Sequence, residues 1–318
     1  MDFSEIPAPD FDLAMTLDSG QVFHWQKAGN GFVGTIGDVP VYVSQEDDVL
    51  KVRCDATPQP ARQRRALPRI VAHYFALDHP LAEICASFPA DPIMNAARDF
   101  CRGLRIIRQP KWECLATFIC SSMKQVAHIR QISAQLRKRF GEQRTLDYHV
   151  IYTFPSLQRL ARATEKELRQ CKLGYRAKNL RATAQLVSSG EFNLKAWTAL
   201  SDAALREQLC ALPGVGAKIA NCVMLFAFER LRAFPIDVWI ERVLRQQYFP
   251  RRKKMTAQQL REFSETYFGK HGGYAQQYLF HYARANGSRS KTMSRSSKES
   301  RSARQSCQRL WRGILFQP

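Results

Sequence analysis

Two hydrophobic patterns divide the chain. The first ~50 residues contain GFVGTIGDVPVYVSQEDDVLKV, where β-branched residues alternate around turns rich in Gly, Asn and Asp, and this predicts a small antiparallel sheet. From about Ala61 onward, apolar residues recur at three- and four-residue spacing, which predicts amphipathic helices. The clearest helical segments are PLAEICASF, NAARDFCRGL, ECLATFICSSMKQVAHIRQISAQLRKRF, SLQRLARATEKELRQC and RAKNLRATAQLV.

These patterns predict an α+β protein with three parts. We expect a β-rich N-terminal domain over residues 1–88 and an all-α domain over residues 89–283, which carries the hairpin described below. Residues 284–318 are rich in Ser and Arg and almost free of periodic apolar positions, so we expect a disordered basic tail.

The charge balance favours a polyanionic partner. The 318 residues include 48 Lys and Arg against 28 Asp and Glu, a formal net charge of +20. Residues 284–318 hold nine Lys or Arg and one Glu, so +12 remains on the rest of the chain. Nucleic acid fits such a surplus because each neutralised phosphate releases counterions, and an acidic membrane surface is the alternative.

Membrane and cofactor signals are weak. No apolar run approaches 18 residues, and the acidic start MDFSEIPAPDFD does not resemble a signal peptide, so we expect an intracellular protein with no membrane partner. The nine cysteines are scattered without a close CxxC pair. This spacing suggests neither disulfides nor a zinc or iron–sulfur site, and we expect no metal or other cofactor.

Residues 205–228, LREQLCALPGVGAKIANCVMLFAF, carry the clearest functional motif. The pattern predicts a helix, a tight turn LPGVG at residues 212–216, and a second helix. Gly214, Val215 and Gly216 would present main-chain amides to an anion at the start of the second helix, as in a clamp for a phosphate backbone. A plain αα-corner explains a Gly-x-Gly turn equally well, but the flanking Leu212 and Lys218 make the motif more specific.

The sequence resembles the helix-hairpin-helix DNA glycosylases, and among them the eukaryotic type of 8-oxoguanine DNA glycosylase. The resemblance spans roughly residues 10–283. It rests on SGQVFHW at 19–25, RQPKWECLATFICSS at 108–122, LGYRAKNL at 173–180, LPGVGAKIANCVMLFA at 212–227, FPIDVWIERV at 234–243 and YAQQYLF at 274–280.

The resemblance implies a base-excision-repair enzyme, a bifunctional glycosylase and AP lyase without a cofactor. Such an enzyme flips 8-oxoguanine out of double-stranded DNA, excises it through a lysine Schiff base and then performs β-elimination. We expect a monomer that acts on duplex DNA containing oxidised guanine, in the nucleus of a eukaryote or the nucleoid and cytoplasm of a prokaryote.

Two residues are the candidate catalytic groups. Lys218 follows the hairpin, where the helix dipole and partial burial both favour a neutral, nucleophilic amine. The resemblance implies that this lysine attacks the sugar. Asp237 precedes a helical run and suits an N-cap, and the resemblance implies that its carboxylate stabilises positive charge developing on the sugar. For Lys218, the alternative explanation is a solvated surface charge, as is usual for an isolated lysine.

Four residues are the candidate pocket for the damaged base. Gln276 and Phe280 are four positions apart and share one face of a helix. The resemblance implies that Gln276 contacts the Watson–Crick edge, that Phe280 and Cys222 cover the ring, and that the carbonyl of Gly20 accepts the hydrogen on N7. For Phe280 and Cys222, simple core packing is the alternative explanation.

Three further residues are candidates for DNA contact. Tyr175 and Arg176 resemble a wedge tyrosine and an arginine that contacts the estranged cytosine. Trp239 stands where the family commonly has a histidine facing a phosphate, so we expect altered backbone contacts there.

The segment that faces the opposite base departs from the family. After ICSS the family has asparagines and then an arginine, whereas this chain has Met123, Lys124, Gln125 and, three residues on, His128. Met123 fills space but has no amide to bond a base, and His128 is a weaker, pH-dependent donor. We therefore predict relaxed discrimination of the opposite base.

Two alternative functions stay open at this point. One is a helix-hairpin-helix glycosylase for a different oxidised or alkylated base, which would retain the lyase chemistry. The other is a noncatalytic DNA-binding protein that uses the hairpin only to hold phosphates. The presence of both Lys218 and Asp237 argues against the second, because binding alone requires neither.

Overall fold

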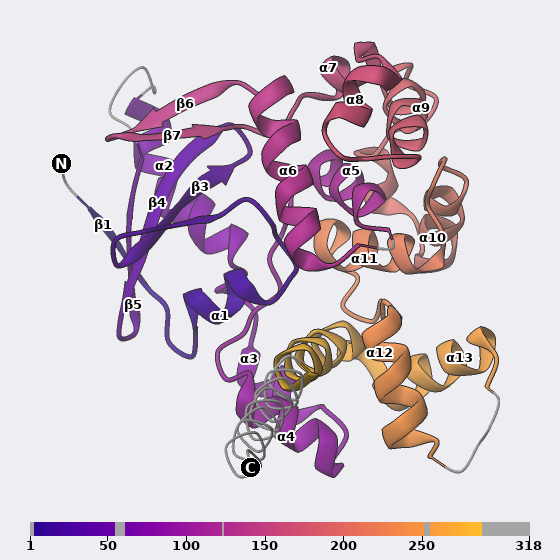
Figure 1. Cartoon of the computed structure of the whole chain (residues 1–318). Coiled ribbons are helices and arrows are strands. Elements are labelled where there is room, and N and C mark those ends of the chain that lie inside the picture. The colour runs from indigo at the N-terminus through magenta and orange to yellow at the C-terminus, as the bar shows by residue number, and fades with distance from the viewer. Residues whose placement is uncertain (1–2, 55–60, 123, 251–254, 288–318) are drawn as a thin grey trace, which may run out of the picture.

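The computed structural model describes residues 3–54, 61–122, 124–250 and 255–287. A five-stranded antiparallel sheet, in the order β1-β5-β4-β3-β2, forms the N-terminal part, and helices dominate the rest (Figure 1). This arrangement confirms the predicted α+β class. The strands are β1 (Ser4–Pro7), β2 (Gln26–Ala28), β3 (Gly31–Ile36), β4 (Val39–Glu46) and β5 (Val49–Arg53), with helix α1 (Leu13–Asp18) between the first two.

The two faces of the sheet pack in different clusters, and this fixes its register. β3 pairs with β4 from Gly31 opposite Ser44 to Ile36 opposite Val39. Val41 and Val43, two positions apart on β4, are both fully buried. They belong to the core that the sheet shares with α2 (Ala61–Tyr74), and a one-residue slip would turn both valines to the other face of the sheet.

The helices enclose the larger hydrophobic core. They are α3 (Leu81–Ala86), α4 (Pro92–Phe100), α5 (Lys111–Ser121), α6 (Val126–Phe140), α7 (Leu157–Arg162), α8 (Glu165–Gln170), α9 (Arg176–Ser188), α10 (Asp202–Cys210), α11 (Ala217–Phe228), α12 (Val238–Val243) and α13 (Ala257–Tyr267). Short helical turns lie at Ala196–Ala199, Leu244–Tyr248 and Gly269–His271. Residues 272–287 form a last helix, which runs beside α12 in Figure 1.

Two segments that the periodicity joins are interrupted in the structure. ECLATFICSSMKQVAHIRQISAQLRKRF forms α5 and α6, separated at residues 122–125. SLQRLARATEKELRQC forms α7 and α8 because Thr164 starts a new helix. Its side chain accepts from the amide of Glu167 while the Glu167 carboxylate accepts from the amide of Thr164, a reciprocal capping box.

A two-stranded hairpin interrupts the region predicted to be all-α. β6 (Gln143–Leu146) pairs with β7 (His149–Tyr152), and in Figure 1 both lie against the five-stranded sheet. Leu146 and Ile151 are buried in one cluster with Val33 and Tyr42 of the sheet. The hairpin is stabilised by this distant partner, which the local spacing of apolar residues does not reveal.

The predicted domain limits have different outcomes. The boundary at residue 88 stays a prediction, and Leu81, Ile84 and Phe88, which precede it, pack in the helical core. Residues 284–287, the predicted start of the disordered tail, continue the last helix instead. The rest of the predicted tail, residues 288–318, lies outside the described residues. Within the described ranges, no helix has the length and apolar character to span a membrane.

A buried ion pair joins the sheet to the helices. Arg137 of α6 bonds to Glu113 of α5, and its guanidinium also donates to Thr35 Oγ1 of β3 at 2.9 Å and to the Tyr152 carbonyl of β7 at 3.0 Å. Burial raises the pKa of Glu113, an effect that the charge of Arg137 opposes. Four separate elements therefore meet at one guanidinium.

We expect Glu113→Leu to lower the free energy of unfolding by about 3–5 kcal/mol, since it leaves a buried guanidinium without its counter-ion. Arginine cannot relieve this cost by losing a proton. Urea denaturation measures the change. The double variant Glu113→Leu/Arg137→Met should recover much of the loss, and a single-variant loss below about 1 kcal/mol, typical of an exposed pair, would contradict the role of this contact.

Candidate active site

The helix-hairpin-helix predicted from LPGVG is present. α10 and α11 are joined by residues 211–216. Gly214 has φ +79°, and a Cβ on it would lie 2.7 Å from the side chain of Asn179, so this close approach requires glycine. Gly216 is the N-cap of α11 and offers no side-chain cap. The first amides of α11 are thereby available for an anion.

A small cavity lies beside this hairpin, at the junction of five parts of the chain. It is lined by Gly20 after α1, Phe118 of α5, Lys218, Cys222 and Phe226 of α11, Pro235 and Asp237 before α12, and Gln276, Gln277 and Phe280 of the last helix. All six residues predicted for catalysis and for the base pocket are among them. Residues 260 positions apart in the sequence thus face one space.

Lys218 enters the cavity from the first turn of α11. Its Nζ lies 3.4 Å from Ser121 Oγ at the end of α5 and 5.2 Å from the ring centroid of Phe118. The aromatic face and the hydroxyl orient the amine, and no carboxylate of the described residues forms an ion pair with it. A lysine in such surroundings suits nucleophilic chemistry better than structural pairing.

Asp237 reaches the cavity from the N-terminus of α12. Its carboxylate accepts a hydrogen bond from the Ile240 amide at 2.9 Å, which fixes it as the N-cap. Burial raises the pKa of this carboxyl group, while the Ile240 amide and the charge of Lys218 oppose that rise. The two predicted catalytic side chains therefore interact electrostatically across the cavity.

The far end of the cavity has the character of a base pocket. Gln276 is 4% exposed, and its Oε1 is buried without a hydrogen-bond partner among the described residues. Buried polar atoms are rarely left unpaired, so this oxygen points to a ligand with a donor. Burial raises the pKa of Cys222, which keeps its thiol neutral and apolar. Phe280 lines the same space.

Gly20 has a backbone conformation and surroundings that exclude other residues. Its φ is +87°, and a Cβ would lie 3.0 Å from both Phe280 Cε1 and Arg284 Nη1. Gln277 donates to the neighbouring Ser19 carbonyl at 2.9 Å. The glycine predicted to read the base therefore lies directly against the predicted ring-stacking residue.

The residues predicted to face the opposite base differ in their exposure to solvent. Tyr175 is 58% exposed at the start of α9, as a wedge requires. Arg176 is only 5% exposed, and its guanidinium donates to the carbonyls of Ser122 and Leu173. To contact a cytosine, Arg176 would have to give up its hydrogen bonds to these two carbonyls. His128 is exposed in the first turn of α6. Met123 lies outside the described residues.

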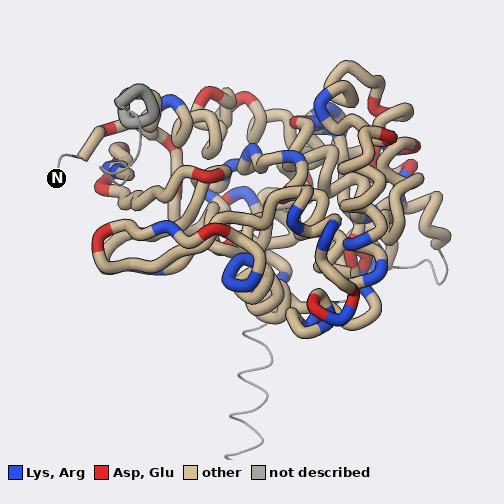
Figure 2. The backbone as a smooth tube through the Cα atoms, turned by 90° about the horizontal axis from the view of Figure 1, so that it is seen from above, with Lys and Arg blue, Asp and Glu red and all other residues tan. Residues whose placement is uncertain are grey.

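Trp239 is partly exposed on α12. The guanidinium of Arg242 lies 5.2 Å from its ring centroid, and Gly287 packs closely against the ring. Figure 2 shows Lys and Arg interspersed with Asp and Glu over the described chain. Contact of Trp239 with the DNA backbone stays a prediction.

Sequence reasoning missed four cavity residues, Phe118, Phe226, Pro235 and Gln277. The rings of Phe118 and Phe226 stack with centroids 5.5 Å apart and form one wall. Phe118 lies in the RQPKWECLATFICSS block, so the sequence indicated the segment but not the role of this side chain.

No group of three His, Cys, Asp or Glu side chains that could hold a metal ion occurs in the described part of the chain. Its eight cysteines are free thiols. Cys307 lies outside the described residues.

Comparison with protein families gives two adjoining matches. Residues 5–115 match the model of the 8-oxoguanine DNA glycosylase N-terminal domain. Residues 116–266 match the HhH-GPD superfamily of base excision DNA repair proteins. The first match covers the sheet and the Gly20 loop, and the second covers the hairpin with Lys218 and Asp237.

Individual relatives extend over most of the chain. A probable N-glycosylase/DNA lyase of Methanothermobacter thermautotrophicus is 30% identical over 308 residues, which cover 89% of this chain and 96% of that protein. The N-glycosylase/DNA lyase OGG1 of Arabidopsis thaliana is 31% identical, with 84% and 74% covered. The structure of the Clostridium acetobutylicum 8-oxoguanine glycosylase/lyase, in complex with double-stranded DNA containing cytosine opposite 8-oxoG, has a TM-score of 0.81 at 29% identity and covers 90% of this chain and all of that one. This chain belongs to the 8-oxoguanine DNA glycosylase family within the helix-hairpin-helix superfamily of base-excision repair proteins.

Proposed function

We propose that this protein excises 8-oxoguanine from duplex DNA and then cleaves the strand at the abasic site through a Schiff base on Lys218. The observation that carries the proposal is the single cavity in which Lys218, Asp237 and the unpaired Gln276 Oε1 meet. An amine, a partly buried carboxylate and an acceptor without a partner among the described residues are the groups that base displacement and base recognition require. A phosphate-binding hairpin alone needs none of them.

Recognition of the base would use three parts of the chain, the loop after α1, α11 and the last helix. Gln276 would accept a hydrogen bond from the Watson–Crick edge of the flipped base, and the Gly20 carbonyl would accept the N7 hydrogen that guanine lacks. Phe280 and Cys222 would cover the two ring faces. The unliganded cavity is only about 50 Å3, well below the roughly 300 Å3 of ordinary ligand pockets, so a lining side chain must move when the base enters.

Lys218 and Asp237 would then share the chemistry at the sugar. As the bond between the base nitrogen and C1′ breaks, its electron pair leaves with the base, and the Asp237 carboxylate stabilises the positive charge on the sugar. The Lys218 amine forms a bond to C1′, and the proton it releases passes to the departing base. The C1′–O4′ bond then breaks, O4′ takes a proton from water, and the nitrogen becomes the Schiff base, which acidifies C2′. Loss of a C2′ proton to water then breaks the bond to the 3′ phosphate, which leaves with the electron pair.

The same proposed function predicts how the DNA is bound. The substrate would be a duplex carrying oxidised guanine, bound by one copy of the protein. Tyr175 would occupy the gap left by the flipped base, and the amides of Gly214, Gly216 and the start of α11 would bind the phosphate backbone. The Val215 amide, also predicted to bind phosphate, already donates to the Leu212 carbonyl. We place the protein wherever the cell keeps its DNA.

We expect Lys218→Gln to abolish covalent trapping by borohydride on a duplex with one 8-oxoguanine opposite cytosine, because the variant has no amine to form the imine. Gel analysis of the trapped complex measures this. Lys270→Gln, which changes a lysine outside the cavity, is the control and should trap like the wild type. Trapping that persists in Lys218→Gln would identify another amine as the nucleophile.

We expect Asp237→Asn to slow 8-oxoguanine excision by about 100-fold or more, since it removes a preorganised charge from the reacting sugar. Asparagine caps helices about as well as aspartate, so the free energy of unfolding should change by less than about 1 kcal/mol. Single-turnover kinetics and urea denaturation separate the two effects. Equal loss of rate and of folded protein would assign Asp237 a structural role only.

The same carboxylate should set the acid limb of the pH profile. Burial raises its pKa above the usual 3.8, so the charged form that catalysis needs is lost at a higher pH than for an exposed aspartate. The single-turnover rate should therefore rise with pH through that pKa in the wild type. In Asp237→Asn this rise should be absent.

We expect little discrimination of the base opposite the lesion, with excision rates within about tenfold for the four partners, because a bidentate arginine contact worth ~1–3 kcal/mol is missing at His128. His128→Arg should restore a preference for cytosine. Single-turnover rates on four duplexes test both statements. Wild-type activity confined to 8-oxoguanine opposite cytosine would contradict them.

A further inference from the structure

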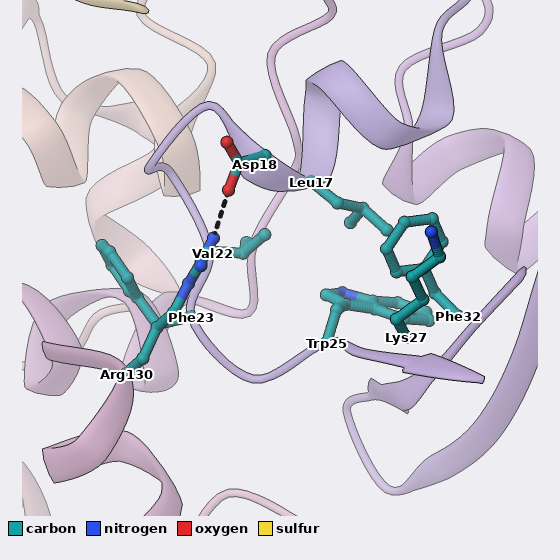
Figure 3. Close-up of a pocket in the computed structure, with 8 residues that line it drawn as sticks. All are labelled: Leu17, Asp18, Val22, Phe23, Trp25, Lys27, Phe32 and Arg130. Carbon is teal, nitrogen blue, oxygen red and sulfur yellow. Dashed lines mark hydrogen bonds and ion pairs between the residues drawn. The ribbon is translucent and has the colours of Figure 1, made fainter. Parts of the chain in front are cut away.

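Asp18, two residues before Gly20, joins two arginines from distant parts of the chain. Its Oδ1 lies 2.6 Å from Arg130 Nη2 of α6, and its Oδ2 lies 3.3 Å from Arg284 Nη2 of the last helix. Arg284 also donates to the main-chain carbonyl of Asp18. Figure 3 shows Arg130 directed toward Asp18 across the mouth of a second cavity.

The second cavity lies where α1 passes into the Gly20 loop. It has a volume of about 200 Å3 and is lined by Leu17 and Asp18 of α1, Val22 and Phe23 after Gly20, Trp25, Lys27, Phe32 and Arg130 (Figure 3). Leu17 and Val22 pack in the core of the N-terminal part, so apolar packing holds both sides of the loop. The polar contacts of Asp18 add a direct connection from this segment to the last helix.

Arg284 is placed to control both the loop and the base pocket. It follows Phe280 by one helical turn, and its guanidinium carbon lies 5.7 Å from the Phe280 ring centroid. Its Nη1 is 3.0 Å from the position that a Cβ of Gly20 would occupy. The side chain is 17% exposed, so it is largely held in this place. His281 lies next to it, with Nδ1 3.3 Å from Arg284 Nη2.

We infer that Arg284 is a positioning residue for base recognition. By bonding the Asp18 carbonyl and carboxylate, Arg284 holds the Gly20 carbonyl and the Phe280 ring in the spacing that accepts the damaged base, with Arg130 supporting Asp18 from α6. This inference rests on the proposed function of the pocket. Arg284 does not line the cavity that holds Lys218 and Asp237, so it acts on recognition and not on the reacting sugar.

Other contacts of the loop remain when Arg284 is replaced. Gln277 still donates to Ser19, and the buried side chain of Gln21 bonds to Arg105 and Ile107. Removal of Arg284 should therefore shift the Gly20 carbonyl without unfolding the N-terminal part. A displacement of about 1 Å in a recognition group is enough to cost roughly 100-fold in rate.

The experiment compares two duplexes, one with 8-oxoguanine opposite cytosine and one with a preformed abasic site opposite cytosine. Excision from the first needs base recognition, whereas cleavage of the second needs only the lysine chemistry. We expect Arg284→Ala to slow single-turnover excision by about 10- to 100-fold and to leave abasic-site cleavage within about twofold of the wild type. The matched control is Arg206→Ala, which removes another partly buried arginine, paired with Glu265, and should change neither rate.

Other results would contradict either the role of Arg284 or the proposed lesion. Parallel loss of both activities in Arg284→Ala would assign Arg284 to folding or DNA binding and overturn the inference, as would an unchanged excision rate. Wild-type protein that cleaves the abasic duplex but leaves 8-oxoguanine in place would overturn the proposed lesion instead, and with it the role of Arg284 in recognising that lesion.

Discussion

The structure depends on one fully buried amide, that of Gln21. Its Nε2 donates to the Arg105 carbonyl at 2.8 Å, its Oε1 accepts from the Ile107 amide at 2.7 Å, and its own carbonyl accepts from the Gln109 side chain at 2.7 Å. Gln109 in turn donates its main-chain amide to the Phe226 carbonyl of α11. A short series of hydrogen bonds therefore connects the residue after Gly20 to the helix that carries Lys218, although the two belong to different layers of the fold. These polar groups are buried, so the loss of one hydrogen-bonding partner would leave another group unpaired. This energetic cost makes the connection rigid.

This rigidity lets the cavity hold polar groups in places where burial is costly. Burial raises the pKa of the Asp237 carboxyl group, and Gln276 Oε1 has no partner among the described residues. Under the proposed function, a cationic sugar and a base with hydrogen-bond donors would lower both costs. A cavity that relaxed to satisfy these groups internally would lose its complementarity to the reacting state. The N-cap bond from the Ile240 amide prevents such relaxation at Asp237 while it stabilises α12.

How much the sequence predicts depends on how local each interaction is. The resemblance selected Lys218, Asp237, Gln276 and Phe280, two at helix starts and two on one helix face, and the cavity brings all four together. The β6–β7 hairpin could not be predicted because its buried residues pack on the distant sheet. Arg284 gave no signal, since its partner Asp18 is 266 positions away. Arg176 shows the opposite limit: the motif marked it, but its nearest acceptors are carbonyls of its own chain.

The proposed reacting groups and most of the proposed recognition groups lie on different elements, which explains how recognition and chemistry can change independently. The proposed nucleophile and its electrostatic partner lie on α11 and at the start of α12, whereas the proposed readers of the base, apart from Cys222 of α11, lie on the loop after α1 and on the last helix. The two sets meet at the cavity, but Gln277 and Arg284 fix the loop to the last helix through contacts that bypass the hairpin. We therefore expect substitutions in the last helix to alter which base fits without moving Lys218. The residues predicted to read the opposite strand form a third set, around α6 and α9, so we expect their substitution to change partner discrimination without any change at Lys218.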